Sequence, residues 1–248
     1  MLTLLLACTG DPEDTGPFDT NLDDTQDSAV EDPCYLAPEP TPLDPASDCP
    51  TGEGGLFAVE DGAYWISQPI AGDEHTELIL FLGGGGAEEQ SVRGNLQGLL
   101  QGDERFLDYR IVAPWVGDSD REASAMAAVQ AVQDCFGGDL SRVHLIGHSS
   151  GGRVAYSLAL DHRFSTVVGF PAMFDSGVSD DDLLEGLECE PVLNAVGSED
   201  SWLGEVQSTH ERLEGLGLDS TLLVVEGEGH VPGPEFDPGP FYDWLDAH

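Results

Sequence analysis

Short apolar runs alternate with amphipathic stretches from about residue 54 of this chain to its end. Six of the runs are rich in β-branched and other large apolar residues and are bounded by Gly, Pro or Asp, as buried strands are. They span residues 78–82, 109–113, 143–146, 166–170, 192–196 and 222–225. The stretches at 88–100, 121–135, 151–160, 180–187 and 203–216 have the apolar spacing of helices. This order predicts an α/β domain whose mostly parallel central sheet carries helices on both faces.

The first 53 residues have a different composition. Residues 9–53 are rich in Asp, Glu, Pro and Thr and contain few large apolar side chains. Such a stretch buries too little apolar surface to offset its chain entropy, and its prolines and like charges extend it. We therefore predict a disordered acidic tether over 9–53 and a folded domain over 54–248.

The chain begins with Met-Leu-Thr-Leu-Leu-Leu-Ala-Cys, an apolar run that leads through the small residue Ala7 to Cys8. It is similar to the end of a bacterial lipoprotein signal, in which the cysteine is lipidated and becomes the mature N-terminus. The resemblance implies an exported protein anchored at a bacterial cell envelope, with residues 1–8 as signal and lipidation site. An ordinary apolar N-terminus is the alternative. Since no other segment approaches the roughly 18 consecutive apolar residues of a membrane span, we expect membrane contact only through a lipid on Cys8.

The formal net charge is −40, because 48 acidic residues face eight basic residues, all of them arginine. A surface this negative repels phosphate backbones and anionic lipid headgroups, which argues against nucleic-acid partners and polybasic membrane docking. The charge also suggests a salty habitat, in which screening removes the self-repulsion.

Four cysteines remain when Cys8 is set aside, and none has the Cys-x-x-Cys spacing of zinc or thioredoxin sites. In an exported protein an even number of cysteines favours disulfides. The favoured pairing is Cys34 with Cys49 and Cys135 with Cys189, and buried free thiols are the alternative.

The pentapeptide Gly147-His-Ser-Ser-Gly151 joins a predicted strand to a predicted helix. A nucleophile elbow between strand and helix needs small residues two positions before and two positions after the nucleophile, because its strained turn brings backbones close together. Gly147 and Gly151 meet this need for Ser149. Ser150 is excluded, because His148 stands two positions before it. The pattern therefore predicts Ser149 as a nucleophile.

A serine hydroxyl needs a general base, and hydrolases with this elbow supply the acid and the histidine in the order Ser, Asp or Glu, His. Asp200 follows the predicted strand 192–196, and His230 follows the predicted strand 222–225. Active sites gather at the carboxyl ends of parallel strands, so we expect both residues near Ser149. His230 is the predicted general base and acid and Asp200 the orienting acid, with Glu199 and Asp175 as weaker alternatives.

The glycine run 83–86 directly follows the predicted strand 78–82. An oxyanion hole takes one N–H from the residue after the nucleophile and one from such a loop. We assign the donors to Ser150 and to Gly84 or Gly85. A flexible turn is the alternative, and a phosphate-binding loop is excluded because it would end in Gly-Lys and this chain has no lysine.

These segments together resemble the polyhydroxybutyrate depolymerase and feruloyl esterase group of α/β-hydrolases. The resemblance covers about residue 78 to the C-terminus and is carried by Asp139-Leu-Ser-Arg-Val-His-Leu-Ile-Gly-His-Ser-Ser-Gly-Gly152, the upstream glycine loop, Gly197-Ser-Glu-Asp200 and Gly227-Glu-Gly-His230. That group usually has His-Gly where this chain has Leu82-Gly83. The resemblance implies the α/β-hydrolase fold, a catalytic domain over 54–248, and hydrolysis of a carboxylic ester through an acyl-serine intermediate without metal or cofactor.

Other residues near the predicted site have structural interpretations. His148 is expected to support the elbow, and His144 to be a hydrogen-bonded core histidine. Trp115 and Trp202, near strand ends, would line an acyl pocket or pack against a loop. The acids 180–182 are typical of a helix N-terminus, where negative charge opposes the helix dipole.

The sequence leaves three functions open. An esterase is favoured, a serine peptidase or acyltransferase on the same fold shares the same triad, and a surface-binding lipoprotein could keep the fold without catalysis. Because no long insertion separates the predicted strands, we expect an open, shallow site for short acyl or bulky exposed esters. The partner is a small-molecule or polymeric ester, and the oligomeric state stays open.

Overall fold

A computed structural model describes residues 55–59, 62–66, 77–85, 89–115, 121–136 and 143–248 of the chain. The predicted signal, tether and lipidation site at Cys8 lie outside the described residues, as do Cys34 and Cys49.

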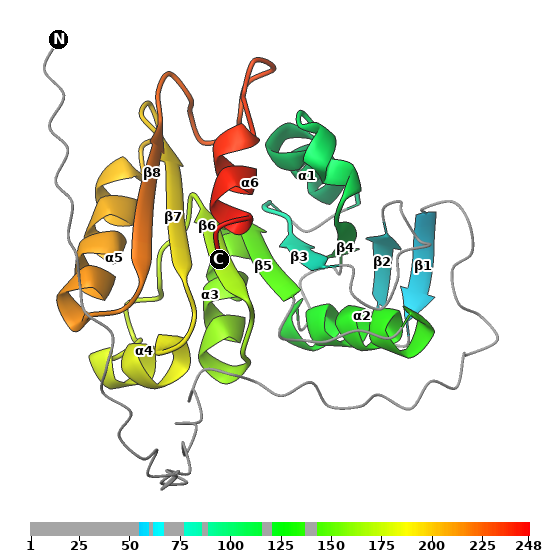
Figure 1. Ribbon diagram of the computed structural model, residues 1–248, viewed down its shortest axis with the longest axis horizontal. Helices are drawn as coiled ribbons and strands as arrows, with labels where there is room; N and C mark the ends of the chain where they lie inside the picture. The colour runs from blue at the N-terminus through cyan, green and yellow to red at the C-terminus, as the bar shows by residue number, and fades with distance from the viewer. Residues whose placement is uncertain (1–54, 60–61, 67–76, 86–88, 116–120, 137–142) are drawn as a thin grey trace, which may run out of the picture. The chain divides into compact units, whose positions relative to one another are not determined.

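The core of the described structure is an eight-stranded sheet in the order β1-β2-β4-β3-β5-β6-β7-β8 (Figure 1). Its six strands from β4 to β8 run parallel, and β1 and β2 are added antiparallel at one edge. The strands are β1 (Gly55–Val59), β2 (Gly62–Ile66), β3 (Leu78–Leu82), β4 (Arg110–Trp115), β5 (Val143–His148), β6 (Thr166–Phe170), β7 (Val192–Gly197) and β8 (Ser220–Val225). The mostly parallel sheet is the one predicted from the sequence.

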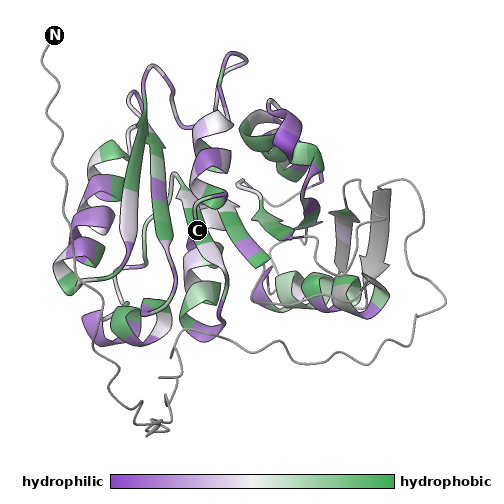
Figure 2. Cartoon of the chain, in the orientation of Figure 1, coloured by the Kyte–Doolittle hydropathy of each residue, from purple (hydrophilic) through white to green (hydrophobic). Residues whose placement is uncertain are grey.

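Helices cover both faces of the sheet. They are α1 (Glu89–Leu100), α2 (Arg121–Phe136), α3 (Ser150–Asp161), α4 (Asp180–Leu187), α5 (Leu203–Leu216) and α6 (Gly239–Leu245), with a 3-10 helix η1 (Glu104–Leu107). Side chains of α2 to α5 join one hydrophobic core, and side chains of α1, η1 and α6 join the other. In β3 the residues alternate between these two cores, since successive side chains of a strand point to opposite faces. Figure 2 shows apolar residues along the central strands and hydrophilic residues on the outer sides of α4 and α5.

Strands β1 and β2 and helix α6 were not predicted. β1 and β2 pair antiparallel, and the sequence signal that could have found them is Asp61-Gly62 between two apolar stretches. Helix α6 is short and follows a proline-rich stretch, although Pro240 stands in its first turn, where a helix tolerates proline. Strand β8 also begins two residues before its predicted start.

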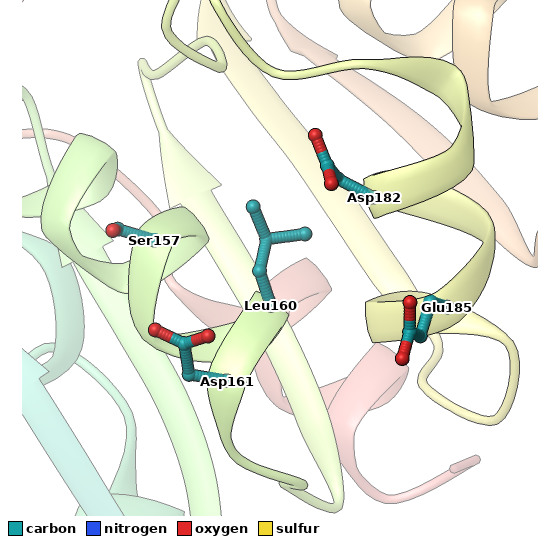
Figure 3. A pocket seen from close by; sticks show the side chains of 5 residues that line it. All are labelled: Ser157, Leu160, Asp161, Asp182 and Glu185. Carbon is teal, nitrogen blue, oxygen red and sulfur yellow. The ribbon is translucent and has the colours of Figure 1, made fainter.

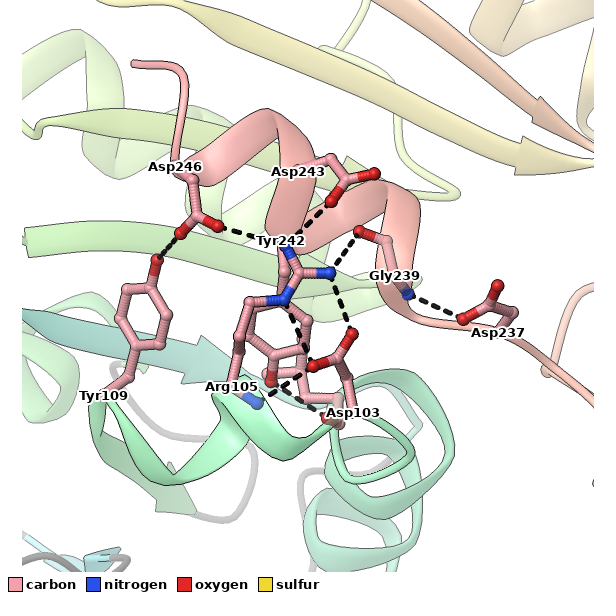
Figure 4. Close-up of polar contacts among 9 residues, drawn as sticks. Asp103, Arg105, Tyr109, Asp237, Gly239, Tyr242, Asp243 and Asp246 are labelled. Atoms are coloured by element: carbon pink, nitrogen blue, oxygen red, sulfur yellow. Dashed lines mark hydrogen bonds and ion pairs between the residues drawn. The ribbon is translucent and has the colours of Figure 1, made fainter.

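The Arg105 side chain links η1 to α6 through ion pairs and a contact with an aromatic ring (Figure 4). Its guanidinium is ion-paired with Asp103, Asp243 and Asp246 at 2.8, 2.8 and 3.0 Å, and it lies 5.3 Å from the centroid of the Tyr242 ring. These contacts hold the C-terminal helix against the sheet face that it covers.

Several smaller predictions concern individual residues. His144 is buried and hydrogen-bonded to Thr166 and Glu77, which confirms a core histidine. Helix α4 begins at Asp180 with Ser179 as its N-cap, which confirms the acidic helix N-terminus. Cys135 and Cys189 are both disulfide-bonded, while the pairing of the cysteines stays a prediction. Within the described residues, no helix combines the length and apolar character needed to cross a membrane.

Candidate active site

Ser149 occupies the turn between β5 and α3. Its φ of 55° makes it the only non-glycine residue with positive φ in the described part of the chain. Its N–H donates to the Phe170 carbonyl at 2.9 Å, which ties the turn to the end of β6. Backbone strain of this kind persists only where the surrounding structure enforces it, and it is the geometry of a nucleophile elbow.

The glycines around Ser149 are required by close backbone contacts. A Cβ on Gly147 would lie 2.5 Å from the Gly152 Cα, and a Cβ on Gly151 would overlap the Leu82 carbonyl oxygen and lie 2.6 Å from the Gly83 oxygen. These are the two positions at which the sequence pattern demanded small residues.

Ser149, His230 and Asp200 form a continuous chain of hydrogen bonds. The Ser149 Oγ lies 2.8 Å from the His230 Nε2, and the His230 Nδ1 lies 3.0 Å from the Asp200 Oδ2. The Asp200 side chain is fully buried, whereas the His230 side chain is 37% exposed. Because a carboxylate only accepts hydrogen bonds, the Nδ1 carries the proton and the Nε2 is free to accept one from the serine.

Asp200 is further held by the Trp202 N–H, which donates to its Oδ1 at 2.8 Å. The alternative acids do not share this position. Glu199 and Asp175 are exposed, and neither is hydrogen-bonded to His230 among the described contacts. The structure thus brings together the three residues that the sequence favoured.

His148 is buried beneath this chain of hydrogen bonds, as a supporting residue would be. Its Nε2 lies 2.9 Å from the His230 carbonyl oxygen. Burial lowers the pKa of the His148 imidazole, so the ring is neutral and its Nε2–H donates to that carbonyl. The Nδ1 is a buried acceptor, and a Cβ on Gly84 would lie 2.7 Å from it. His148 therefore ties the loop that carries His230 to the end of β5.

The glycine loop after β3 lies against the elbow. A Cβ on Gly84 would be 2.8 Å from the Ser149 Cβ. The Gly84 N–H donates to the Asn95 Oδ1 at 2.9 Å, which leaves Gly85, with φ of 74°, as the remaining loop donor of the two candidates. The Ser150 N–H stands at the first position of α3, where a backbone N–H has no acceptor within the helix.

Trp202 packs edge-on against the catalytic candidate His230. The two ring centroids are 4.7 Å apart at an interplanar angle of 82°. The Arg153 guanidinium lies 5.5 Å from the centroid of the Trp202 ring. Trp202 thus covers one side of the imidazole, while the Trp115 side chain lies outside the described residues.

The hollow in Figure 3 is a separate feature. It has a volume of about 310 Å³ between α3 and α4 and is lined by Ser157, Leu160, Asp161, Asp182 and Glu185. It contains none of the residues of the hydrogen-bonded chain. Among the described residues, no three His, Cys, Asp or Glu side chains are grouped to hold a metal ion.

Two supporting residues escaped the sequence reasoning. Asn95 lies on α1, eleven positions from the Gly84 that it binds, and nothing in the local sequence links them. Glu228 receives the Gly233 N–H at 2.6 Å on its Oε2, and its carbonyl receives the Glu199 N–H at 2.9 Å. It therefore braces the loop that carries His230. The sequence feature that could have indicated Glu228 is its position between two glycines, Gly227 and Gly229.

No protein-family model matches this chain, and no curated protein matches it. Solved structures do share its fold. A hormone-sensitive lipase from a metagenome library aligns with a TM-score of 0.60 at 16% identity, over 83% of this chain and 88% of that one. A fungal esterase from Rhizomucor miehei gives 0.57 at 12% identity, over 79% and 82%. Carboxyl esterase 2 from the fungus Tuber melanosporum gives 0.55 at 16% identity, over 71% and 78%. The domain therefore has the α/β-hydrolase fold.

Proposed function

We propose that this protein is a serine hydrolase that cleaves carboxylic esters through an acyl-serine intermediate. The observation that carries the proposal is the hydrogen-bonded series from Ser149 through His230 to Asp200, which starts at a strained turn between strand and helix. The esterases and lipases that share the fold support the same reaction class.

The geometry supports a two-step reaction. In the first step the Ser149 Oγ attacks the ester carbonyl while its proton passes over 2.8 Å to the His230 Nε2. Asp200 stabilises the imidazolium, which then protonates the leaving alcohol. In the second step His230 takes a proton from water, whose oxygen attacks the acyl carbon. The bond from the acyl carbon to the Ser149 Oγ then breaks, the imidazolium returns its proton to the Oγ, and the acid is released.

The negative charge that develops on the carbonyl oxygen in both steps needs preorganised donors. The Ser150 and Gly85 N–H groups are the proposed pair. The N-terminal end of α3 adds its partial positive charge at the same point, because Ser149 directly precedes the helix.

The proposed substrates are short acyl or bulky exposed esters. This choice rests on the sequence, which has no long insertion between strands, and on its resemblance to polyhydroxybutyrate depolymerases and feruloyl esterases. Esters graded by acyl length test it, and a strong preference for long acyl chains would count against it.

The proposed setting is a bacterial cell envelope, to which a lipid on Cys8 and the acidic segment 9–53 attach the domain. Mass spectrometry of the protein from a bacterial host that processes lipoproteins tests this setting. Lipid is expected on Cys8 and is expected to be lost in Cys8→Ala.

The proposed activity is tested with p-nitrophenyl acetate and p-nitrophenyl butyrate. Wild type should hydrolyse both esters, and Ser149→Ala should reduce hydrolysis to the background rate. Ser208→Ala is a matched control, because Ser208 is exposed on α5 and its hydroxyl donates to the Gly204 carbonyl, its one side-chain hydrogen bond within the described residues. Equal rates for wild type and Ser149→Ala would reject the proposal in favour of a non-catalytic binding protein.

A further inference from the structure

Arg121, the first residue of α2, contacts both residues that supply the proposed oxyanion hole. Its Nη2 donates to the Gly85 carbonyl at 2.9 Å, and its Nη1 donates to the Ser150 Oγ at 3.2 Å. The Ser150 hydroxyl in turn donates to the same Gly85 carbonyl at 3.1 Å. The three groups form a closed triangle that joins the start of α2, the glycine loop and the start of α3.

The Gly85 N–H belongs to the peptide that joins Gly84 to Gly85, and this peptide is anchored on both sides. The Gly84 N–H before it is held by Asn95 from α1, and the Gly85 carbonyl after it is held by Arg121 and Ser150. Gly85 adopts a positive φ of 74°, and glycine populates positive and negative φ about equally readily, so the residue itself does not fix this conformation. The direction of the Gly85 N–H therefore depends on these two anchors.

Arg121 differs from the ion-paired arginines of this chain in the groups that it contacts. Within the described residues, Arg93, Arg105 and Arg212 form ion pairs with carboxylates, whereas the described contacts of Arg121 are to a carbonyl and a hydroxyl. In a protein with 48 acidic and eight basic residues, the Arg121 guanidinium stands beside the proposed hole, and no carboxylate of the described residues is ion-paired with it. Its charge is available to a developing oxyanion.

We propose that Arg121 is a positioning residue of the oxyanion hole: its guanidinium holds Gly85 and Ser150 at a fixed separation and adds positive charge beside them. The planar fork of arginine suits this role, because two of its nitrogens reach two acceptors at once, which a lysine ammonium does less well. The inference rests on the proposed ester hydrolysis, and it concerns the transition state rather than binding of the ester.

The first test is the steady-state kinetics of Arg121→Gln with p-nitrophenyl butyrate. Misplaced or weakened oxyanion donors should lower kcat by about 10- to 100-fold and leave KM within about twofold. Arg121→Lys keeps the charge with a poorer bridge and should recover part of the loss. Arg93→Gln, which removes the same charge from an exposed pair on α1, is the matched control and should behave as wild type.

A second measurement separates positioning from a general structural role. An aryl trifluoromethyl ketone adds the Ser149 oxygen to its carbonyl carbon, the serine proton moves to His230, and the resulting oxyanion occupies the hole. Its inhibition constant should rise in Arg121→Gln by about the same factor as kcat/KM falls, while the thermal midpoint stays close to that of wild type. Ser150→Ala keeps its N–H but loses the hydroxyl, and its effect should not add to that of Arg121→Gln.

The outcomes separate this inference from the proposed function. If wild type shows no hydrolysis that depends on Ser149, the proposed function fails and the inference fails with it. If wild type is active but Arg121→Gln keeps its kcat and its ketone affinity, the inference alone is overturned. A rise in KM at unchanged kcat would also overturn it, because Arg121 would then bind the ester. If Arg121→Gln does not fold, Ser150→Ala carries the test, and unchanged kcat and ketone affinity in that variant would overturn the inference.

Discussion

Asp200 illustrates how much of this site depends on one buried side chain. Its two carboxylate oxygens have separate tasks, since Oδ1 accepts the Trp202 N–H and Oδ2 faces the His230 Nδ1. The first contact fixes the carboxylate, and the second fixes the tautomer of the histidine. A substitution can therefore remove the electrostatic task and keep the structural one.

Asp200→Asn is that substitution. An asparagine oxygen can still accept from Trp202, but its amide would donate to the His230 Nδ1 and place the imidazole proton on the Nε2, which then cannot take the Ser149 proton. We expect kcat to fall by about four orders of magnitude while KM and the thermal midpoint change little. Steady-state kinetics beside exposed Glu199→Gln check this result. An Asp200→Asn protein as active as wild type would assign the acid to another residue.

The residues of the proposed triad could be predicted because each lies in a local pattern, within five residues of the end of a strand that the apolar periodicity indicates. The roles of Arg121 and Asn95 could not be predicted, because their contacts join helices α2 and α1 to residues far away in the sequence. Arg121 reaches Ser150 across 29 positions and Gly85 across 36, and no spacing in the sequence encodes such contacts. The sequence also could not show which glycine of the run supplies the oxyanion-hole donor, because the four residues are identical. The hydrogen bond from the Gly84 N–H to Asn95 distinguishes them in the structure.

At the scale of elements, the close approach of the start of α3 to the end of β3 determines the shape of the elbow. Gly151 stands where the start of α3 passes the end of β3, and the Leu82 and Gly83 carbonyl oxygens occupy the space that a Cβ on Gly151 would need. The contact is between backbones, so neither side can yield by changing a rotamer.

Gly151→Ala should therefore destabilise the protein by roughly 3 kcal/mol or more and abolish hydrolysis. Gly94→Ala is the matched control, because Gly94 lies within α1 and a Cβ there meets nothing within 4 Å. That change should stabilise the protein by about 0.5–1 kcal/mol through helix propensity. Urea unfolding of both variants measures the difference, and similar free energies of unfolding would contradict the close contact.

Glu190 links the turn before β6 to the turn before β7. It is buried, and its Oε1 accepts the Phe164 N–H at 2.7 Å. Burial raises the pKa of Glu190 from 4.5 to about 8. Between those two values the folded protein keeps the proton and the unfolded chain loses it. The contribution of protonated Glu190 to the free energy of unfolding is therefore fully present below about pH 4.5 and is lost as pH rises toward 8.

Glu190→Gln tests this linkage, because glutamine keeps an acceptor for Phe164 and does not titrate. Relative to the variant, wild type should lose free energy of unfolding from pH 5 to pH 8, by at most about 1.4 kcal/mol per pH unit. Urea unfolding at several pH values within this window gives the difference between the two proteins. A constant difference would show that Glu190 is ionised in the folded state throughout.

The six parallel strands were predictable because their sequences are nearly continuous apolar runs, although β8 at the sheet edge is only half-buried. The hairpin of β1 and β2 was missed because its strands lie at the antiparallel edge, where the apolar signal is interrupted by Gly62 and the acids before it. Helix α6 was missed because packing against the sheet, and not its local sequence, stabilises it as a helix. Phe241, Tyr242 and Leu245 are buried against the sheet, although the sequence around them is rich in Pro and Gly.

For the whole molecule, the net charge of −40 is the dominant property, and the Arg105 cluster shows its local consequence. A single guanidinium there holds three carboxylates. Elsewhere the excess acids repel one another, so stability should rise with ionic strength. We propose a salty habitat on this ground.

Urea unfolding in 0.02 to 2 M NaCl tests the effect of charge, since urea adds no ions. The free energy of unfolding should increase steeply up to a few tenths molar salt, where the Debye length falls below about 10 Å, and then level off. Sucrose at matched osmolality is the control for solute exclusion. If the protein is no more stable at molar salt than at low salt, charge repulsion does not destabilise it, and the proposal of a salty habitat is rejected.

Covalent labelling tests most directly whether Ser149 is an activated nucleophile. A fluorophosphonate reacts with a serine whose proton has a base to accept it, forming the Oγ–P bond and releasing fluoride. Intact mass and peptide mapping should show one adduct per chain, located on Ser149, absent from Ser149→Ala and strongly slowed in His230→Gln. No adduct on the wild-type protein, or an adduct that persists in Ser149→Ala, would contradict the proposed catalytic role of the elbow.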